Sequence, residues 1–73
     1  MSDPIRVRVF EDIHGWGYEV FNARGEFMIG ERGAFRERDL ALGFAFANVQ
    51  QKLGAHAFAD GVDLKVDPPL AGK

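Results

Sequence analysis

The chain has 73 residues, a net charge of −2 and no cysteine. A chain of this length forms one small domain, 1–73, and the lack of cysteine excludes disulfides and thiolate metal ligands. Hydrophobic residues make up 47% of the sequence, which is enough for a core, and no apolar run is long enough to span a membrane. We therefore expect a cytoplasmic protein without a signal peptide, with loose tails at 1–4 and 68–73.

Alternating apolar and polar residues predict strands at 5–10, 16–21 and 62–66, and a shorter strand is expected at 26–29. Between the second and third strands the chain reads Asn-Ala-Arg-Gly, which predicts a hairpin loop with Gly25 at positive φ. The next segment, 30–35, holds two glycines and two charged residues and is predicted to be a loop.

A helix is predicted from residue 36 or 37 to Leu53, with Asp39 as its candidate N-cap and Gly54 as its C-terminal stop. The short segment 55–59 that follows is a connector of ambiguous structure. The predicted order is β-β-β-α-β, an α+β fold in which one helix packs on one face of an antiparallel sheet.

The predicted helix carries two apolar stripes on nearly opposite sides. We expect the first stripe to pack on the sheet, so that the core consists of Val7, Val9, Tyr18, Val20, Leu42, Phe46, Val49, Leu53 and Leu64. The second stripe is the predicted partner interface, formed by Leu40, Phe44, Ala47 and Gln51. Alternatively, the connector 55–59 folds back through Phe58 and covers the second stripe within one chain.

The residues that carry most enzyme chemistry are scarce. The chain has no threonine, its one serine is Ser2, and its two histidines, His14 and His56, have no neighbouring metal-ligand spacing. Because nucleophilic and acid–base catalysis need a positioned partner, we expect no enzyme activity, no catalytic residue, no metal site and no cofactor.

Arginines on the predicted sheet and loop suggest a second surface. Candidate nucleic-acid or partner contacts are Arg6, Arg8, Trp16, Arg32 and Arg36. Acidic residues alternate with the loop arginines, and a nucleic-acid binder normally carries a basic footprint, so the charge balance argues against nucleic acid.

Glycines and one aromatic residue follow a pattern in the hairpin and the helix. Gly17-Tyr18, the turn from Asn22 to Gly25-Glu26, then Gly33, Asp39 and Gly43 resemble the YegP-like family of small bacterial proteins. The resemblance covers about residues 5–49 and implies a sheet-plus-helix fold; it transfers no catalytic residue, because the family has no firmly assigned activity.

The chain departs from that family in two ways. Ala34 follows Gly33 where the family has an aromatic residue, and the helix opens with Arg36-Glu37-Arg38 instead of small polar residues. Family members often carry the unit in tandem, whereas this chain has one unit and an extra strand, which makes pairing between chains attractive. We expect a non-enzymatic protein–protein interaction module that forms a homodimer through its helix. The alternatives are a small phage-type inhibitor of a host complex, similar to anti-CRISPR proteins, and a nucleic-acid-binding module.

Overall fold

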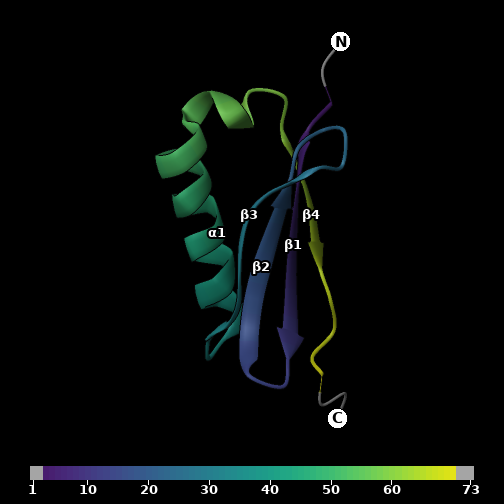
Figure 1. Ribbon diagram of the computed structural model, residues 1–73, viewed down its shortest axis with the longest axis vertical. Coiled ribbons are helices and arrows are strands. Elements are labelled where there is room, and N and C mark those ends of the chain that lie inside the picture. Colours follow the sequence, from purple (N-terminus) through teal and green to yellow (C-terminus); the bar gives the residue numbers. More distant parts are fainter. Residues whose placement is uncertain (1–2, 71–73) are drawn as a thin grey trace.

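Four strands and one α-helix build the structure, a computed structural model that describes residues 3–70 (Figure 1). In chain order the elements are β1 (Ile5–Asp12), β2 (Gly15–Phe21), β3 (Phe27–Phe35), α1 (Arg38–Leu53), the short 3₁₀ helix η1 (Ala55–Phe58) and β4 (Val62–Val66). The predicted α+β class and the order β-β-β-α-β are confirmed. No helix among residues 3–70 is long and apolar enough to cross a membrane.

The strands lie in the order β3-β2-β1-β4, so β3 and β4 form the two edges of the sheet. The β1–β2 and β2–β3 pairs are antiparallel, whereas β4 pairs with β1 in parallel, from Ile5 opposite Val62 to Val9 opposite Val66. The prediction of a purely antiparallel sheet is therefore wrong for β4. The crossover through α1 brings the chain back to its starting end, which is what a parallel pair requires.

The third strand is longer than predicted, because segment 30–35 continues β3 instead of forming a loop. Trp16 lies opposite Phe35 while Tyr18 lies opposite Glu31, so β3 holds extra residues opposite Gly17. This irregularity is a β-bulge, and Gly33 accommodates it with a φ of 64°. The glycines in 30–35 therefore mark a distorted strand.

One hydrophobic layer joins the sheet to α1. Val7, Val9, Tyr18, Val20 and Val49 are buried as predicted, and they are joined by Trp16, Ala41 and Ala45. The predicted burial of Leu42, Phe46 and Leu53 is only partly correct, because these side chains lie on the flank of α1. The predicted burial of Leu64 is wrong, since 42% of this residue is exposed. The helix packs against β1, β2 and β3, which leaves β4 outside its cover (Figure 1).

The helix ends differ from each other in how they are capped. Glu37 is the N-cap residue and makes no side-chain capping bond, while the predicted cap, Asp39, lies inside the first turn. Gly54 ends the helix as predicted, with a φ of 91° and an N–H that donates to the Gln50 carbonyl at 3.1 Å. Of the predicted tails, 1–2 and 71–73 lie outside the described residues. Within the C-terminal one, the Leu70 N–H donates to Glu11 at 2.7 Å.

The packing of the bulge gives a test of the sheet register. A Cβ at position 17 would collide with the backbone of Glu31 and Arg32. We expect Gly17→Ala to lower the free energy of unfolding by about 1–3 kcal/mol, the usual cost of overpacking, as measured by urea denaturation. Gly25→Ala is not a suitable control because of its positive φ. Ala34→Gly, on the exposed part of the bulge, should change stability by less than half the Gly17→Ala effect.

Candidate functional site

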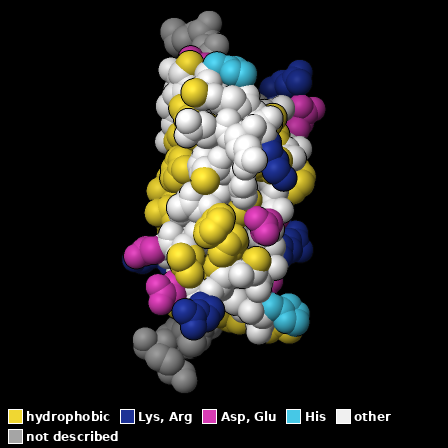
Figure 2. Space-filling model, turned by 90° about the vertical axis from the view of Figure 1, so that its left-hand side faces the viewer, with side chains coloured by type: hydrophobic (Ala, Val, Ile, Leu, Met, Phe, Trp, Pro, Cys, Tyr) yellow, Lys and Arg dark blue, Asp and Glu magenta, His cyan; other side chains and the backbone are white. Residues whose placement is uncertain are grey.

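The outer face of α1 is the candidate site, and its character follows from how the helix meets the sheet. The inward residues are Ala41, Ala45 and Val49, all fully buried. Two larger apolar side chains point outward, with Leu40 42% exposed and Phe44 51% exposed. Figure 2 faces this side of the molecule and shows hydrophobic side chains gathered over the helix between charged ones.

Phe44 is held in place on the surface by other aromatic rings. Its ring stacks on Phe35 of β3, with centroids 5.1 Å apart and an interplanar angle of 27°. Phe35 in turn packs against the buried Tyr18, with centroids 6.2 Å apart. The series Tyr18–Phe35–Phe44 runs from the core to the surface, so Phe44 is presented as a fixed, half-exposed ring.

Beside Phe44 the helix surface is hollowed. A shallow depression of about 200 Å³ is lined by Asp39, Leu40, Gly43, Phe44 and Ala47. A Cβ added at Gly43 would meet no atom within 4 Å, so the space above this glycine is open. The surface therefore combines a protruding ring with an adjacent recess, and Asp39 is the charged residue in its lining.

The structure brings the predicted interface residues together. Leu40, Phe44, Ala47 and Gln51 are all exposed along the outer face of α1. The alternative in which segment 55–59 covers this face is wrong, because Phe58 packs against Phe46 on the flank, with ring centroids 5.9 Å apart. The outer face of α1 is left uncovered by the connector.

A polar cluster borders the candidate face where α1 meets β3. Asn48 donates from its side-chain amide to the Tyr18 hydroxyl, which donates to Glu31 at 3.2 Å. Burial raises the pKa of the Tyr18 hydroxyl above its ordinary value, and the negative charge of Glu31 adds to this, while the Asn48 bond opposes it. Tyr18 therefore stays protonated as a link between helix and sheet.

The other sheet face carries an ion-pair network. Arg8 contacts Glu19 at 3.2 Å and Asp67 at 2.7 Å, and Arg32 contacts the second oxygen of Glu19 at 3.0 Å. The Arg8 guanidinium also lies 4.8 Å from the centre of the Phe10 ring. The hydrogen bond to Asp67 raises the pKa of Arg8. These carboxylates neutralise the two arginines locally.

The five candidate nucleic-acid or partner contacts do not form one surface. Arg6, Arg8 and Arg32 lie on the sheet face opposite α1, where Arg8 and Arg32 are paired with carboxylates, whereas Arg36 is exposed between β3 and α1. Trp16 is only 8% exposed and belongs to the core between the sheet and α1. A buried ring is not available for stacking on bases.

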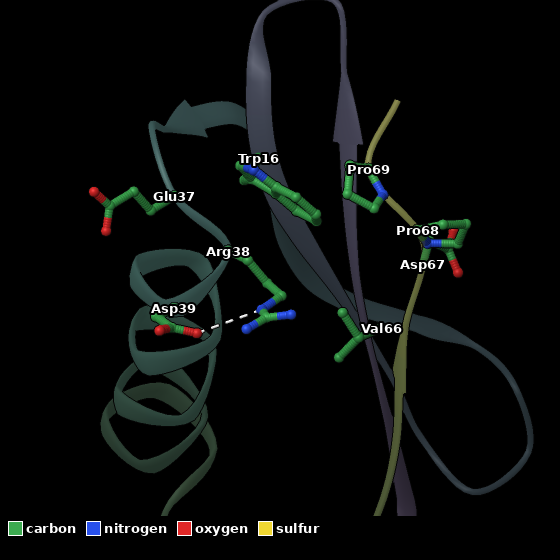
Figure 3. A pocket seen from close by; sticks show the side chains of 8 residues that line it. All are labelled: Trp16, Glu37, Arg38, Asp39, Val66, Asp67, Pro68 and Pro69. Atoms are coloured by element: carbon green, nitrogen blue, oxygen red, sulfur yellow. Dashed lines mark hydrogen bonds and ion pairs between the residues drawn. The ribbon is translucent and has the colours of Figure 1, made fainter. Parts of the chain in front are cut away.

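One hollow on the surface was not predicted from the sequence. It has a volume of about 480 Å³ and lies between the start of α1 and the end of β4, with lining residues Trp16, Glu37, Arg38, Asp39, Val66, Asp67, Pro68 and Pro69. In Figure 3, Arg38 reaches into it between Trp16 and Val66 and pairs with Asp39 at 3.4 Å, while Glu37 points away. Asp39 and Asp67 outnumber its one guanidinium, so the hollow lacks the positive charge that phosphate binding needs.

Similarity to known proteins assigns the chain to no family. No family model matches the chain, and neither a curated protein nor a solved structure shows significant similarity to it. The resemblance to the YegP-like family therefore stays a prediction. Among residues 3–70, no group of three or more histidine, aspartate or glutamate side chains is arranged to hold a metal ion.

The raised pKa of Tyr18 predicts how stability changes in alkali. The unfolded chain releases the phenol proton at a lower pH than the folded chain, so above pH about 10 the folded state binds more protons. The contribution of Tyr18 to the free energy of unfolding is complete below that pH and is lost as the pH rises through the folded-state pKa. Since the chain has one tyrosine, its phenolate absorbance should report this pKa directly.

Tyr18→Phe is the matched control for the alkaline titration. Urea denaturation at neutral pH and above pH about 10 should show a steeper loss of stability for the wild type than for Tyr18→Phe. Equal slopes for the two proteins, or a phenolate titration in the native protein below its ordinary pKa, would contradict the role of burial at this hydroxyl.

Proposed function

We propose that the chain is a non-enzymatic protein-interaction module that binds a second copy of itself through the outer face of α1. One observation carries the proposal: α1 packs Ala41, Ala45 and Val49 against its own sheet and leaves two large apolar side chains, Leu40 and Phe44, about half exposed on the surface. A helix with apolar residues on every side is normally buried on every side. A second molecule completes the burial that one sheet does not provide.

Burying these side chains contributes a modest free energy of association for each one, and a two-fold interface counts each contribution twice. Burying a leucine or phenylalanine completely contributes about 1.5–3 kcal/mol, so covering the exposed part of Leu40 or Phe44 is worth about 1 kcal/mol. A two-fold interface uses each side chain twice. Because the stack on Phe35 already fixes the Phe44 ring, little side-chain entropy is lost when it binds.

The shape of the face supports a second copy as the partner. A two-fold interface needs a patch that is complementary to itself, and here the protruding Phe44 lies beside the recess at Gly43. Two antiparallel helices can place the Phe44 ring of each over the Gly43 recess of the other. Ala47 is small enough to let the two backbones approach closely.

Phe44→Glu tests the helix interface. A carboxylate on this face would have to be desolvated in the assembly, so we expect the variant to reduce the molar mass measured by light scattering by at least half over a range of concentrations. Gln50→Glu is the control, because it adds the same charge at an exposed position of α1 outside the recess. Circular dichroism should show that both variants remain folded.

Two outcomes would contradict the helix interface. One is a wild-type mass that Phe44→Glu leaves unchanged. The other is loss of the folded state in Phe44→Glu, which would place this ring in the core of a single chain and not at an interface.

Gly43→Ala separates the stability of the subunit from its association. In the Phe44→Glu background, the added methyl group should raise the free energy of unfolding by about 1 kcal/mol, because alanine favours a helix and the space is open. With Phe44 intact, the same methyl group should weaken association by filling the recess. Association as tight as that of the wild type would show that the recess does not receive the partner.

A further inference from the structure

The free edge of β4 has unused backbone groups. The Asp67 N–H donates to the Val9 carbonyl at 2.8 Å, so this residue directs its backbone toward β1. Backbone direction alternates along a strand that is paired in parallel, so Asp63 and Lys65 also direct theirs toward β1. The N–H and C=O groups of Val62, Leu64 and Val66 therefore point to the open edge, where they can pair with another strand.

The side chains of β4 are exposed on both faces of the sheet. Leu64 and Val66 share the helix side with Val7 and Val9, their neighbours in β1, and yet 42% and 39% of them are exposed. Asp63 and Lys65 are exposed on the opposite side and make no ion pair with any of residues 3–70. The strand thus carries an uncovered apolar row and two unpaired opposite charges.

The sequence of β4 is complementary to its own reverse. It reads Val-Asp-Leu-Lys-Val, with Leu64 at its centre. When two such strands pair antiparallel about a two-fold axis at Leu64, each Asp63 lies opposite the Lys65 of the other copy. Val62 likewise lies opposite Val66, so apolar residues meet apolar residues and each charge meets its opposite.

The backbone groups satisfy this same register. Leu64 directs its N–H and C=O outward, as a hydrogen-bonded pair at the two-fold axis requires, and the two Val62–Val66 pairs are hydrogen-bonded in the same way. Asp63 and Lys65 then occupy non-hydrogen-bonded pairs, in which facing side chains come closest. Shifting the register by one residue would put charges on the apolar side, so it is disfavoured.

We infer that β4 is an association edge through which a second copy of the chain continues the sheet. The partner is a second copy because the charges and the apolar row of β4 match those of another β4 in reverse. This inference goes beyond the helix interface and does not depend on it. Pairing at β4 places both helices on one face of an eight-stranded sheet and leaves their outer faces free.

The two edges of the sheet differ in regularity, and pairing with a second copy requires a regular edge. Natural edge strands avoid pairing through bulges, prolines or repelling charges. The β3 edge carries bulges, with register shifts opposite β2. The β4 strand pairs with β1 without a register shift, and its prolines, Pro68 and Pro69, come after the strand has ended. The edge that remains regular is therefore also the edge that is complementary to itself.

Exchange of the two charges tests the β4 edge, and it is done in the Phe44→Glu background to remove the helix interface. Asp63→Lys would place lysine opposite lysine, and Lys65→Asp would place aspartate opposite aspartate. We expect the Phe44→Glu protein to dimerise and each single exchange to raise its dissociation constant at least about tenfold, measured by sedimentation equilibrium. An equimolar mixture of the two variants should form a 1:1 heterodimer, because every charge then meets its opposite.

Two controls separate pairing from net charge. The double variant Asp63→Lys with Lys65→Asp still places each charge opposite the complementary charge of the other copy. It should therefore dimerise as the Phe44→Glu protein does. Asp60→Lys adds the same charge as Asp63→Lys at an exposed turn outside β4 and should leave the dissociation constant within about twofold. Raised salt should reduce the difference between the single variants and their mixture.

The outcomes distinguish the two interfaces. A Phe44→Glu protein that stays monomeric at high concentration, or a mixture that associates no better than the single variants, would overturn pairing at β4. If Phe44→Glu leaves the wild-type mass unchanged while the charge exchange behaves as expected, the helix interface fails and the β4 edge stands. Recovery in the mixture also excludes misfolding as the reason for weak association of the single variants.

Discussion

The close approach of α1 to the sheet through Ala41 and Ala45 is the constraint on which the rest of the structure depends. Because these side chains are small and fully buried, the helix lies low over β2. That position lets Asn48 reach the Tyr18 hydroxyl and lets Phe44 stack on Phe35. It also limits coverage: a helix about 10 Å wide does not cover four strands spaced about 4.8 Å apart. The uncovered strand is β4.

Local patterns were sufficient to predict most elements of the fold. Alternation located the strands, Gly25 marked the hairpin, and Gly54 marked the helix end, since each depends on the residues close to it. The direction of β4 was missed because alternation describes one strand and not its partner. The extension of β3 was missed because glycine is typical of loops and of bulges alike, and only the pairing with β2 distinguishes them.

The candidate site was also predicted only in part, because local patterns do not show which face of an element another element covers. Helical periodicity placed Leu40 and Phe44 on one face, and the structure shows them exposed there. The sequence did not reveal that Ala41 and Ala45, which lie between the two apolar stripes, would face the sheet. The charges and apolar residues of β4 were visible, but its free edge emerges only from the strand order. Trp16 was a candidate contact residue, and the structure places it in the core; a strand pattern alone does not identify the covered face.

On the sheet face opposite α1, charged side chains pair with one another. Glu19 is buried between Arg8 and Arg32, and Asp67 holds the other side of Arg8. Asp63 and Lys65 take no part in this network and make no ion pair with the described residues, so β4 carries two opposite charges that are free to pair. Two different two-fold interfaces on one chain generate either a closed tetramer or an open row of subunits, depending on how their axes meet. The proposed helix and edge contacts therefore make the angle between α1 and β4 the quantity that determines assembly size.

The parallel pairing of β1 with β4 also has a consequence for how the chain folds. It joins the first strand of the described chain to the last, so its contacts are among the longest-range in the sequence. Such contacts form late, because the loop between them must close before they contribute free energy. The hairpin of β1 and β2, with β3 and α1, can assemble earlier from contacts nearer in sequence. During synthesis the β1 edge therefore stays open until β4 arrives, and a neighbouring nascent chain that offers its own β4 competes for that edge, which is a route to domain swapping.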